Sequence, residues 1–231
     1  MLLGNRVRPI TIALTLCAVL GYPGRAHAQT PAFALNGPVA NIETVENEVV
    51  RYYDSGRHDA DVAKVDAHLQ AYVDERLKAG VQKPAVVFDI DDTCLSTFAY
   101  ERAHQFAYDA ASWAQWEHAD RFPAIAPTLR LARHLAREHI SIFFITGRRT
   151  ADRSATLAEL AQAGYPRATA LYLRPMDDHA KSVIPFKSGA RKRIEAQGYD
   201  ILASVGDQWS DLRGGYADHV YKLPNPMYLL P

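Results

Sequence analysis

Short apolar segments alternate with amphipathic ones from about residue 81 to residue 223. Five apolar runs have the length of buried strands and are rich in β-branched or aromatic residues: 85–88, 140–145, 168–173, 201–205 and 219–223. Between them, apolar residues recur at helical spacing over 127–137, 152–163 and 187–196. Because strand and helix alternate regularly, the pattern predicts an α/β core over 81–231, with a parallel sheet between two layers of helices.

Two longer amphipathic segments precede this core. Apolar residues recur at helical spacing from Asn41 to about Ser55, and again from Asp59 to Lys78. We therefore expect two helices within residues 41–80. Their apolar faces can pack on the core or form a contact between copies of the chain in a homo-oligomer.

The segment 98–127 interrupts the alternation and is rich in aromatic residues and histidine. It lies between the first strand and the next regular helix, where an insertion covers the carboxyl edge of the sheet. We interpret it as a small helical cap whose aromatic residues mostly form its own core. Tyr100 and Trp113 are also candidates for contact with a substrate, and such rings can stack on a nucleobase.

The first 28 residues have the pattern of a secretory signal peptide. Arg6 and Arg8 precede an apolar run over 10–20, which is too short to span a bilayer, and Ala28 ends a small-x-small cleavage site. We expect cleavage near Ala28, a flexible arm over 29–40, and a periplasmic or secreted protein without a stable membrane anchor.

Charge and cysteine content narrow the classes of partner. The 26 basic residues of the chain match its 26 acidic ones, but the signal peptide contains three arginines and no acids, which leaves a mature net charge of about −3. This argues against a nucleic-acid polymer or an anionic membrane as the main partner. Cys94 is the one cysteine after residue 28, so no disulfide forms within the mature chain, and we interpret it as a packing residue.

The first strand of the core ends in three carboxylates. Side chains at i and i+2 of an extended segment share a face, so Asp89 and Asp91 are expected to lie several Å apart at the carboxyl edge. Two ionised carboxylates that close repel unless one is protonated or a cation such as Mg²⁺ lies between them. Asp92 faces the other way, and we expect it to cap a turn with Thr93. For an isolated acidic triplet, turn capping alone would explain all three acids.

Two more strands end in polar clusters at the same edge. Thr146 offers a hydroxyl, and the backbone N–H of Gly147 can approach an anion closely. Asp207 and Asp211 follow another strand and can complete an oxygen cage for Mg²⁺. Lys187 brings a positive charge suited to a phosphate oxygen.

Anion-binding donors that face a carboxylate-held metal are suited to phosphoryl transfer. Asp89 is the better candidate for a nucleophile that forms an aspartyl phosphate. Asp91 can protonate the leaving alkoxide and then deprotonate the attacking water. Mg²⁺ and Lys187 would screen the negative charges. The expected partner is a small-molecule phosphomonoester.

Taken together, these motifs resemble the haloacid dehalogenase (HAD) superfamily in the form of its secreted acid phosphatases. The run 89–100 is similar to the first signature, 144–148 to the middle motif and 206–211 to the closing acidic motif. The residues at 209–212 and 113–127 are similar to those of class B/C-like acid phosphatases and plant vegetative storage proteins. The resemblance covers roughly residues 85–223.

The resemblance implies a HAD-like Rossmannoid fold with a cap, an Mg²⁺ cofactor and an acidic pH optimum. It implies that Asp89 is a nucleophile that also binds metal, and that Asp91 is an acid/base that binds metal through its backbone carbonyl. It further implies that Thr146 and Lys187 bind the phosphate, that Asp207 binds Mg²⁺, and that Asp211 supports the metal directly or through water. Lys181 and Lys192 lie near Lys187 in the sequence, but Lys187 fits the family pattern better. For Arg148, a substrate contact and a surface salt bridge are both open.

Two other functions deserve comparison. A response-regulator-like receiver also has acids after its first strand, a Thr and a Lys, but its phosphoacceptor should end the central strand, whereas 170–173 is followed by Arg174 and Pro175. A storage or binding protein on a phosphatase scaffold is the second alternative, since a fold does not fix a function. Intact Asp89 and Asp91 argue against it.

Overall fold

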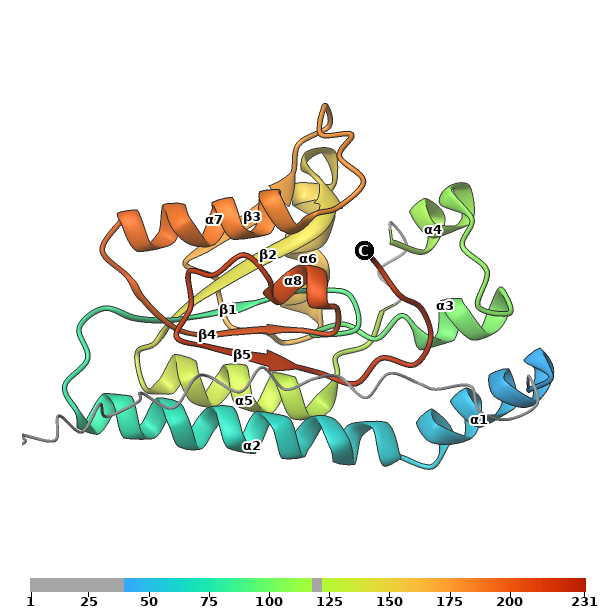
Figure 1. Ribbon diagram of the computed structural model, residues 1–231, viewed down its shortest axis with the longest axis horizontal. Coiled ribbons are helices and arrows are strands. Elements are labelled where there is room, and N and C mark those ends of the chain that lie inside the picture. The colour runs from blue at the N-terminus through green and yellow to red at the C-terminus, as the bar shows by residue number, and fades with distance from the viewer. Residues whose placement is uncertain (1–39, 118–121) are drawn as a thin grey trace, which may run out of the picture. The chain divides into compact units, whose positions relative to one another are not determined.

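The computed structural model describes residues 40–117 and 122–231 (Figure 1). The predicted signal peptide and most of the predicted arm fall on residues 1–39, outside these ranges. Within the described ranges, no helix is both long and apolar enough to cross a membrane.

Five parallel strands form one sheet in the order β3-β2-β1-β4-β5. Their bounds are β1 Pro84–Phe88, β2 Ser141–Arg149, β3 Ala170–Arg174, β4 Asp200–Gly206 and β5 His219–Lys222. The first strand in the sequence is therefore the central one, and each of its residues after Pro84 is buried, as expected for a strand covered on both faces. The predicted α/β fold class is confirmed.

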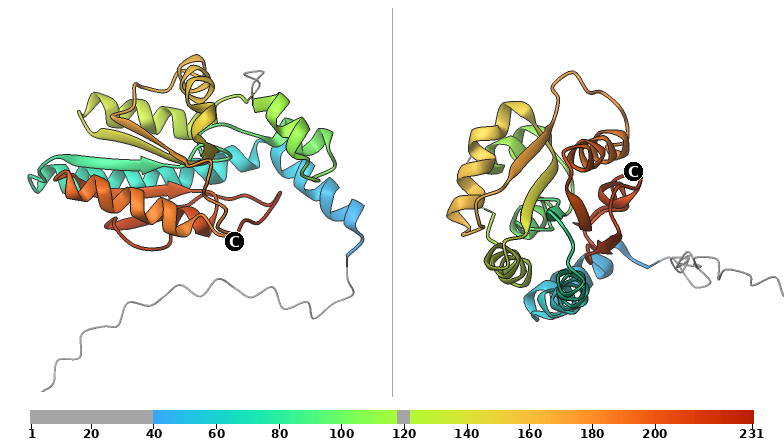
Figure 2. Two further views of the ribbon diagram at one scale, coloured as in Figure 1. Left: turned by 90° about the horizontal axis from the view of Figure 1, so that it is seen from above. Right: turned by 90° about the vertical axis from the view of Figure 1, so that its left-hand side faces the viewer.

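Helices cover both faces of the sheet, so that helices, sheet and helices form three layers, as the end-on view in Figure 2 shows. Val86 and Phe88 point to a core shared with α2 (Arg57–Lys78), α5 (Ala126–Arg137) and α6 (Arg153–Gln162). Ala85 and Val87 point to the opposite core, which α7 (Ile184–Ala196) covers. The period of two along β1 thus divides its side chains between two apolar layers.

The two predicted amino-terminal helices are present as α1 (Ile42–Asp54) and α2. Tyr53 of α1 stacks between the rings of His58 and Phe98, each at 4.3 Å between centroids, which ties α1 to the start of the cap. Ile42 and Val45 of α1 remain exposed. A contact between copies through these helices stays a prediction.

The cap consists of α3 (Phe98–Ala103) and α4 (Ala110–Glu117), after which Ala124 pairs with Leu95. Tyr100 lies at its centre, fully buried, with Trp113 and Trp116 edge-on at 5.1 and 5.8 Å between centroids. The prediction of a small helical cap with an aromatic core is thus correct for the described residues. Tyr100 as a substrate contact is corrected, because its ring is enclosed and its hydroxyl hydrogen-bonds within the cap.

Two predicted boundaries differ from the structure by three residues or more. β2 was expected to end at Ile145 but continues to Arg149, because Thr146 still pairs with Leu173 before the register shifts. α7 begins three residues before the predicted start at Lys187, and Pro185 in its first turn is compatible with this because a proline there removes no helical hydrogen bond. Cys94 is buried in the core, as predicted for a packing residue.

Asp66 of α2 is a buried carboxylate that leads to a testable prediction. It is 5% exposed, and neither of its oxygens has a hydrogen-bond partner among the described residues. Burial raises its pKa to about 7. Because the pKa of Asp66 is higher in the folded than in the unfolded state, the folded state binds the proton more tightly. Stability is therefore lost as pH rises from about 4 to 7.

We therefore expect Asp66→Asn to stabilise the protein at pH 8 by up to about 4 kcal/mol, and by much less at pH 4. Urea unfolding of the variant and the wild type at both pH values measures this difference. Asp177→Asn, at an exposed site, is the matched control. An Asp66→Asn effect that is equal at the two pH values would contradict the assignment.

Candidate active site

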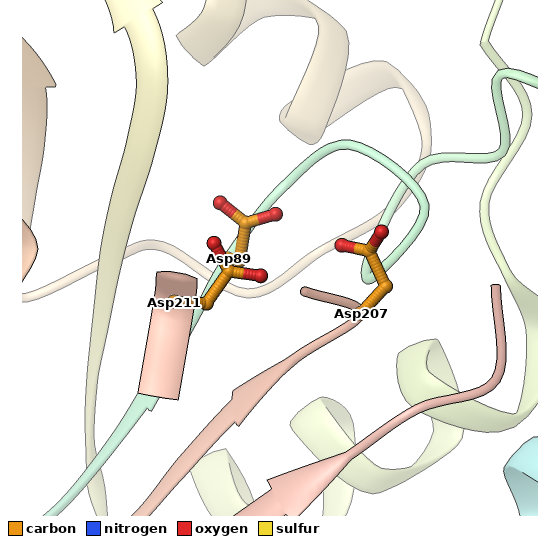
Figure 3. A group of neighbouring side chains, drawn as sticks. All are labelled: Asp89, Asp207 and Asp211. Carbon is orange, nitrogen blue, oxygen red and sulfur yellow. The ribbon is translucent and has the colours of Figure 1, made fainter. Parts of the chain in front are cut away.

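Three acids from the predicted clusters meet at the carboxyl edge of the sheet, and we call them the acidic centre: Asp89, Asp207 and Asp211 (Figure 3). Asp89 follows β1, Asp207 follows β4, and Asp211 lies in the short helix α8 (Trp209–Leu212). Each offers one carboxylate oxygen, and these oxygens lie within 4.8 Å of one another. All three side chains are buried. The prediction that these strand ends are neighbours in space is correct.

The turn between β4 and α8 brings Asp211 back over the end of the strand. A Cβ at Gly206 would lie 2.5 Å from the Cβ of Asp211, so only glycine leaves room for this return. The N–H of Gln208 donates to Oδ2 of Asp211 at 2.8 Å, which fixes that carboxylate across the turn. The close spacing of the two acids therefore depends on Gly206.

Lys187 of α7 reaches the acidic centre from the helix layer that covers Ala85 and Val87. Its Nζ lies 2.5 Å from Oδ1 of Asp89 and 2.6 Å from Oδ1 of Asp211. Burial lowers the pKa of Lys187, but the two carboxylates outweigh burial and raise it, so the side chain stays charged. The structure thus brings Lys187 to the acids, whereas Lys192 lies over the ring of Tyr216.

The acidic centre carries more negative charge than Lys187 offsets. Burial, followed by the charge of Asp211, raises the pKa of Asp89 well above its usual range and that of Asp207 to about 6. Close, buried carboxylates with raised pKa values favour a cation, and an all-oxygen donor set fits Mg²⁺. These residues therefore fit the metal that the sequence predicted.

Asp91 departs from the expectation that a cation lies between its carboxylate and that of Asp89. The chain stops being extended after Asp89: the N–H groups of Cys94 and Leu95 both donate to the carbonyl of Ile90, so the rule for i and i+2 no longer applies. The carboxylate of Asp91 instead accepts from Arg148, at 2.6 Å from Nη2 and 3.1 Å from Nε. Asp91 as a metal ligand through its backbone carbonyl stays a prediction.

Arg148 lies in a buried network and not in a surface salt bridge, which corrects one of its two predicted roles. Its side chain is 1% exposed, and Nη1 donates to Oε2 of Glu159, itself 2% exposed, at 2.6 Å. The ring of Phe122, where the chain returns from the cap, lies 5.9 Å from the guanidinium carbon. Arg148 therefore joins Asp91 to α6 and to the end of the cap.

Thr146 and Gly147 lie beside the acidic centre on β2, next to β1 in the sheet. Thr146 is buried, and its Oγ accepts the N–H of Arg148 at 3.1 Å, which leaves its own O–H free to donate. Gly147 is exposed, and a Cβ there would meet no atom within 4 Å. Both groups are thus available to an anion.

Asp92 joins the turn after β1 to a segment far along the chain. Its carboxylate accepts from the backbone and hydroxyl of Thr97 at 2.9 and 2.5 Å, and from the hydroxyl of Tyr228 at 2.7 Å. Burial, followed by the charge of Asp207, raises its pKa to about 8. The expected turn cap is present, but its partner is Thr97, whereas Thr93 bonds to Asp207.

Sequence reasoning assigned no role to several residues of the site, among them Glu159, Asn225 and Tyr228. Glu159 had a detectable signal, because it lies one residue before Leu160 on the buried face of α6. The other two follow β5, and their local sequence gives no sign of their partners.

Comparisons with known proteins agree with this geometry. A family model for the HAD superfamily, subfamily IIIB (acid phosphatase), matches residues 26–231. Acid phosphatase 1 of Solanum lycopersicum is 34% identical over 62% of this chain, which spans only 58% of that relative. The stem 28 kDa glycoprotein of Glycine max is 31% identical over 83% of this chain and 79% of its own length. Vegetative storage protein 1 of Arabidopsis thaliana is 31% identical over 63% of this chain and 55% of its own length.

A solved structure supports the fold. The class C acid phosphatase from Bacillus anthracis with tungstate bound superposes with a TM-score of 0.68 at 22% identity, over 81% of this chain and 86% of that one. The family model covers the core, the cap and the segment after β5. The chain belongs to the acid phosphatase family of the HAD superfamily, subfamily IIIB.

Proposed function

We propose that this protein is an Mg²⁺-dependent acid phosphatase that hydrolyses small phosphomonoesters through an aspartyl phosphate. The observation that carries the proposal is the acidic centre with Lys187 bound to it, at the carboxyl edge of the sheet of an acid phosphatase family member. Phosphoryl transfer needs carboxylates, a lysine and hydrogen-bond donors that can bind an anion, and all of these lie at one edge of the sheet.

The first step is attack by Asp89 on phosphorus. Lys187 lies against this carboxylate, and its charge reduces the repulsion between the two anions. The hydroxyl of Thr146 and the N–H of Gly147 would donate to phosphoryl oxygens. Asp89, Asp207 and Asp211 would hold Mg²⁺, which supplies further positive charge next to the phosphoryl group.

Asp91 would move the protons. When the bond from phosphorus to the leaving oxygen breaks, its electron pair goes to that oxygen, which takes a proton from Asp91. The Asp91 carboxylate then takes a proton from water, whose oxygen attacks phosphorus and releases Asp89. In the structure, the contact with Arg148 fixes the direction of the Asp91 carboxylate.

Substrate selectivity would come from the cap. Trp113 and Trp116 are half-buried residues whose rings pack edge-on against Tyr100. Such rings can stack on a base or on an aryl group, which makes a 5′-nucleotidase activity one form of this proposal. Phosphate release from nucleotides, sugar phosphates and aryl phosphates would rank these classes.

A storage protein on the same scaffold is the second candidate, and the relative named vegetative storage protein 1 supports it. Such a protein needs no nucleophile. Asp89, buried in contact with Lys187, therefore favours the enzyme.

The test of the main proposal is turnover of an aryl phosphate. We expect EDTA to abolish the activity, Mg²⁺ to restore it, and Asp89→Asn to reduce kcat by about 10³-fold or more, because the nucleophile is lost. The exposed variant Asp177→Asn is the control and should match the wild type. A wild-type protein without Mg²⁺-dependent turnover would favour the storage function.

The role of Asp91 is tested by the leaving group. For alkyl phosphates, Asp91→Asn should lower kcat by about 10²- to 10⁴-fold, because the alkoxide leaves unprotonated. For p-nitrophenyl phosphate, whose leaving group needs no proton, phosphorylation should continue while hydrolysis slows. Mass spectrometry after an acid quench should then find a phosphoryl group on Asp89. Equal losses for both esters without a phosphoenzyme would refute this role.

We also propose export of the chain, based on the signal-peptide pattern of residues 1–28 and supported by a relative named as a glycoprotein. N-terminal sequencing of the protein recovered from the periplasm or the medium should begin near Gln29. A recovered chain that retains residues 1–28 would contradict this proposal.

A further inference from the structure

The segment that follows β5 lies against the acidic centre. We call residues 223–231 the tail segment, and Figure 1 shows it leaving β5 and turning back beside α8. Leu223 and Met227 anchor it in the protein, at 0% and 8% exposure. Polar groups of the segment reach two acids of the site.

Asn225 contacts Asp207 directly. Its Nδ2 donates to Oδ2 of Asp207 at 2.7 Å, while its Oδ1 accepts the N–H of Met227 at 2.8 Å. The local turn occupies the amide oxygen, so the NH₂ group has to face the acid. The direction of this hydrogen bond is therefore set by the tail segment itself.

Gln208 provides a second donor to the same oxygen. Its Oε1 accepts the N–H of Leu230 at 3.0 Å, and its Nε2 donates to Oδ2 of Asp207 at 2.8 Å. The backbone of the tail segment thus also orients this amide. Because Oδ1 of Asp207 accepts from the hydroxyl of Thr93, the carboxylate is fixed at both oxygens.

Tyr228 holds the other acid. Its hydroxyl donates to Oδ2 of Asp92, which also binds Thr97 at the start of α3. The tail segment therefore connects β4, the turn after β1 and the cap.

We propose that the tail segment is a positioning element of the acidic centre, in which Asn225 directs the carboxylate of Asp207 toward a bound metal ion. This inference rests on the metal dependence in the proposed function. Asn225 acts through Asp207 and touches no reacting atom. Hydrogen-bonded partners of metal ligands commonly set metal affinity, because they fix the ligand's orientation before binding.

The alternative is that the tail segment only covers the apolar core. Asn225→Asp separates the two roles. The variant keeps the size of the side chain and an acceptor for Met227, but it replaces the donor to Asp207 by a second carboxylate, which repels it. Leu223 and Met227 are unchanged, so the apolar anchors remain.

The experiment measures metal binding directly on the full chain. Titration with Mn²⁺, followed by its electron paramagnetic resonance signal, should show about 10- to 100-fold weaker binding for Asn225→Asp than for the wild type. The rise of Tm on addition of Mg²⁺ should shrink in parallel. Asn47→Asp, which adds the same charge at an exposed site of α1, is the control.

Asn225→Ala is a second variant that keeps the test valid if Asn225→Asp does not fold. It removes the donor without adding a charge, and its Mn²⁺ affinity should fall by less than that of Asn225→Asp but measurably. Wild-type affinity in folded Asn225→Asp and Asn225→Ala would overturn the positioning role and leave the proposed function intact. A wild type that binds neither Mn²⁺ nor Mg²⁺ would overturn both proposals.

Discussion

Repulsion between the carboxylates of Asp89, Asp207 and Asp211 is the constraint on which the rest of the site depends. At oxygen separations within 4.8 Å, in a buried setting, these groups cannot all be ionised without compensation. Lys187 of α7 neutralises part of this negative charge. Thr93, Gln208 and Asn225 donate hydrogen bonds to the carboxylate of Asp207. Groups from α7 and from the segments after β1, β4 and β5 are thus needed to hold one cluster of acids.

Asp91 belongs to a second electrostatic network, beside this cluster. Arg148 is paired with Asp91 and Glu159, both at 2.6 Å, so the positive charge belongs to two acids at once. A buried arginine cannot be released cheaply from such a pair, because desolvation penalises an unpaired charge. Two carboxylates two residues apart therefore have different environments, one facing a lysine and two further acids, the other facing an arginine. Different environments are what allow two similar side chains to take different chemical roles.

The sequence was sufficient for the features that local patterns encode. The apolar runs became the strands, and their polar ends met because parallel strands finish at one edge. The pairing of Asp91 with Arg148 was not predicted, because it joins residues 57 positions apart and the rule for i and i+2 ends where the turn begins. The tail segment was missed for another reason. Tyr228 lies 136 residues from Asp92, and no periodicity reveals a hydrogen bond of that separation.

The central position of β1 has a consequence for the order of folding. Ala85 pairs with Ser141, and Pro84 pairs with Asp200, so both neighbours of β1 come from distant parts of the chain. Pairings that close such long loops form slowly. Asp89 and Asp207 are brought together only when β1 pairs with β4, so their repulsion does not act before that pairing. A folding barrier that is crossed before this pairing does not depend on the repulsion between the acids. The free-energy cost of bringing the acids together then appears in the unfolding rate, and so in the lifetime of the folded state.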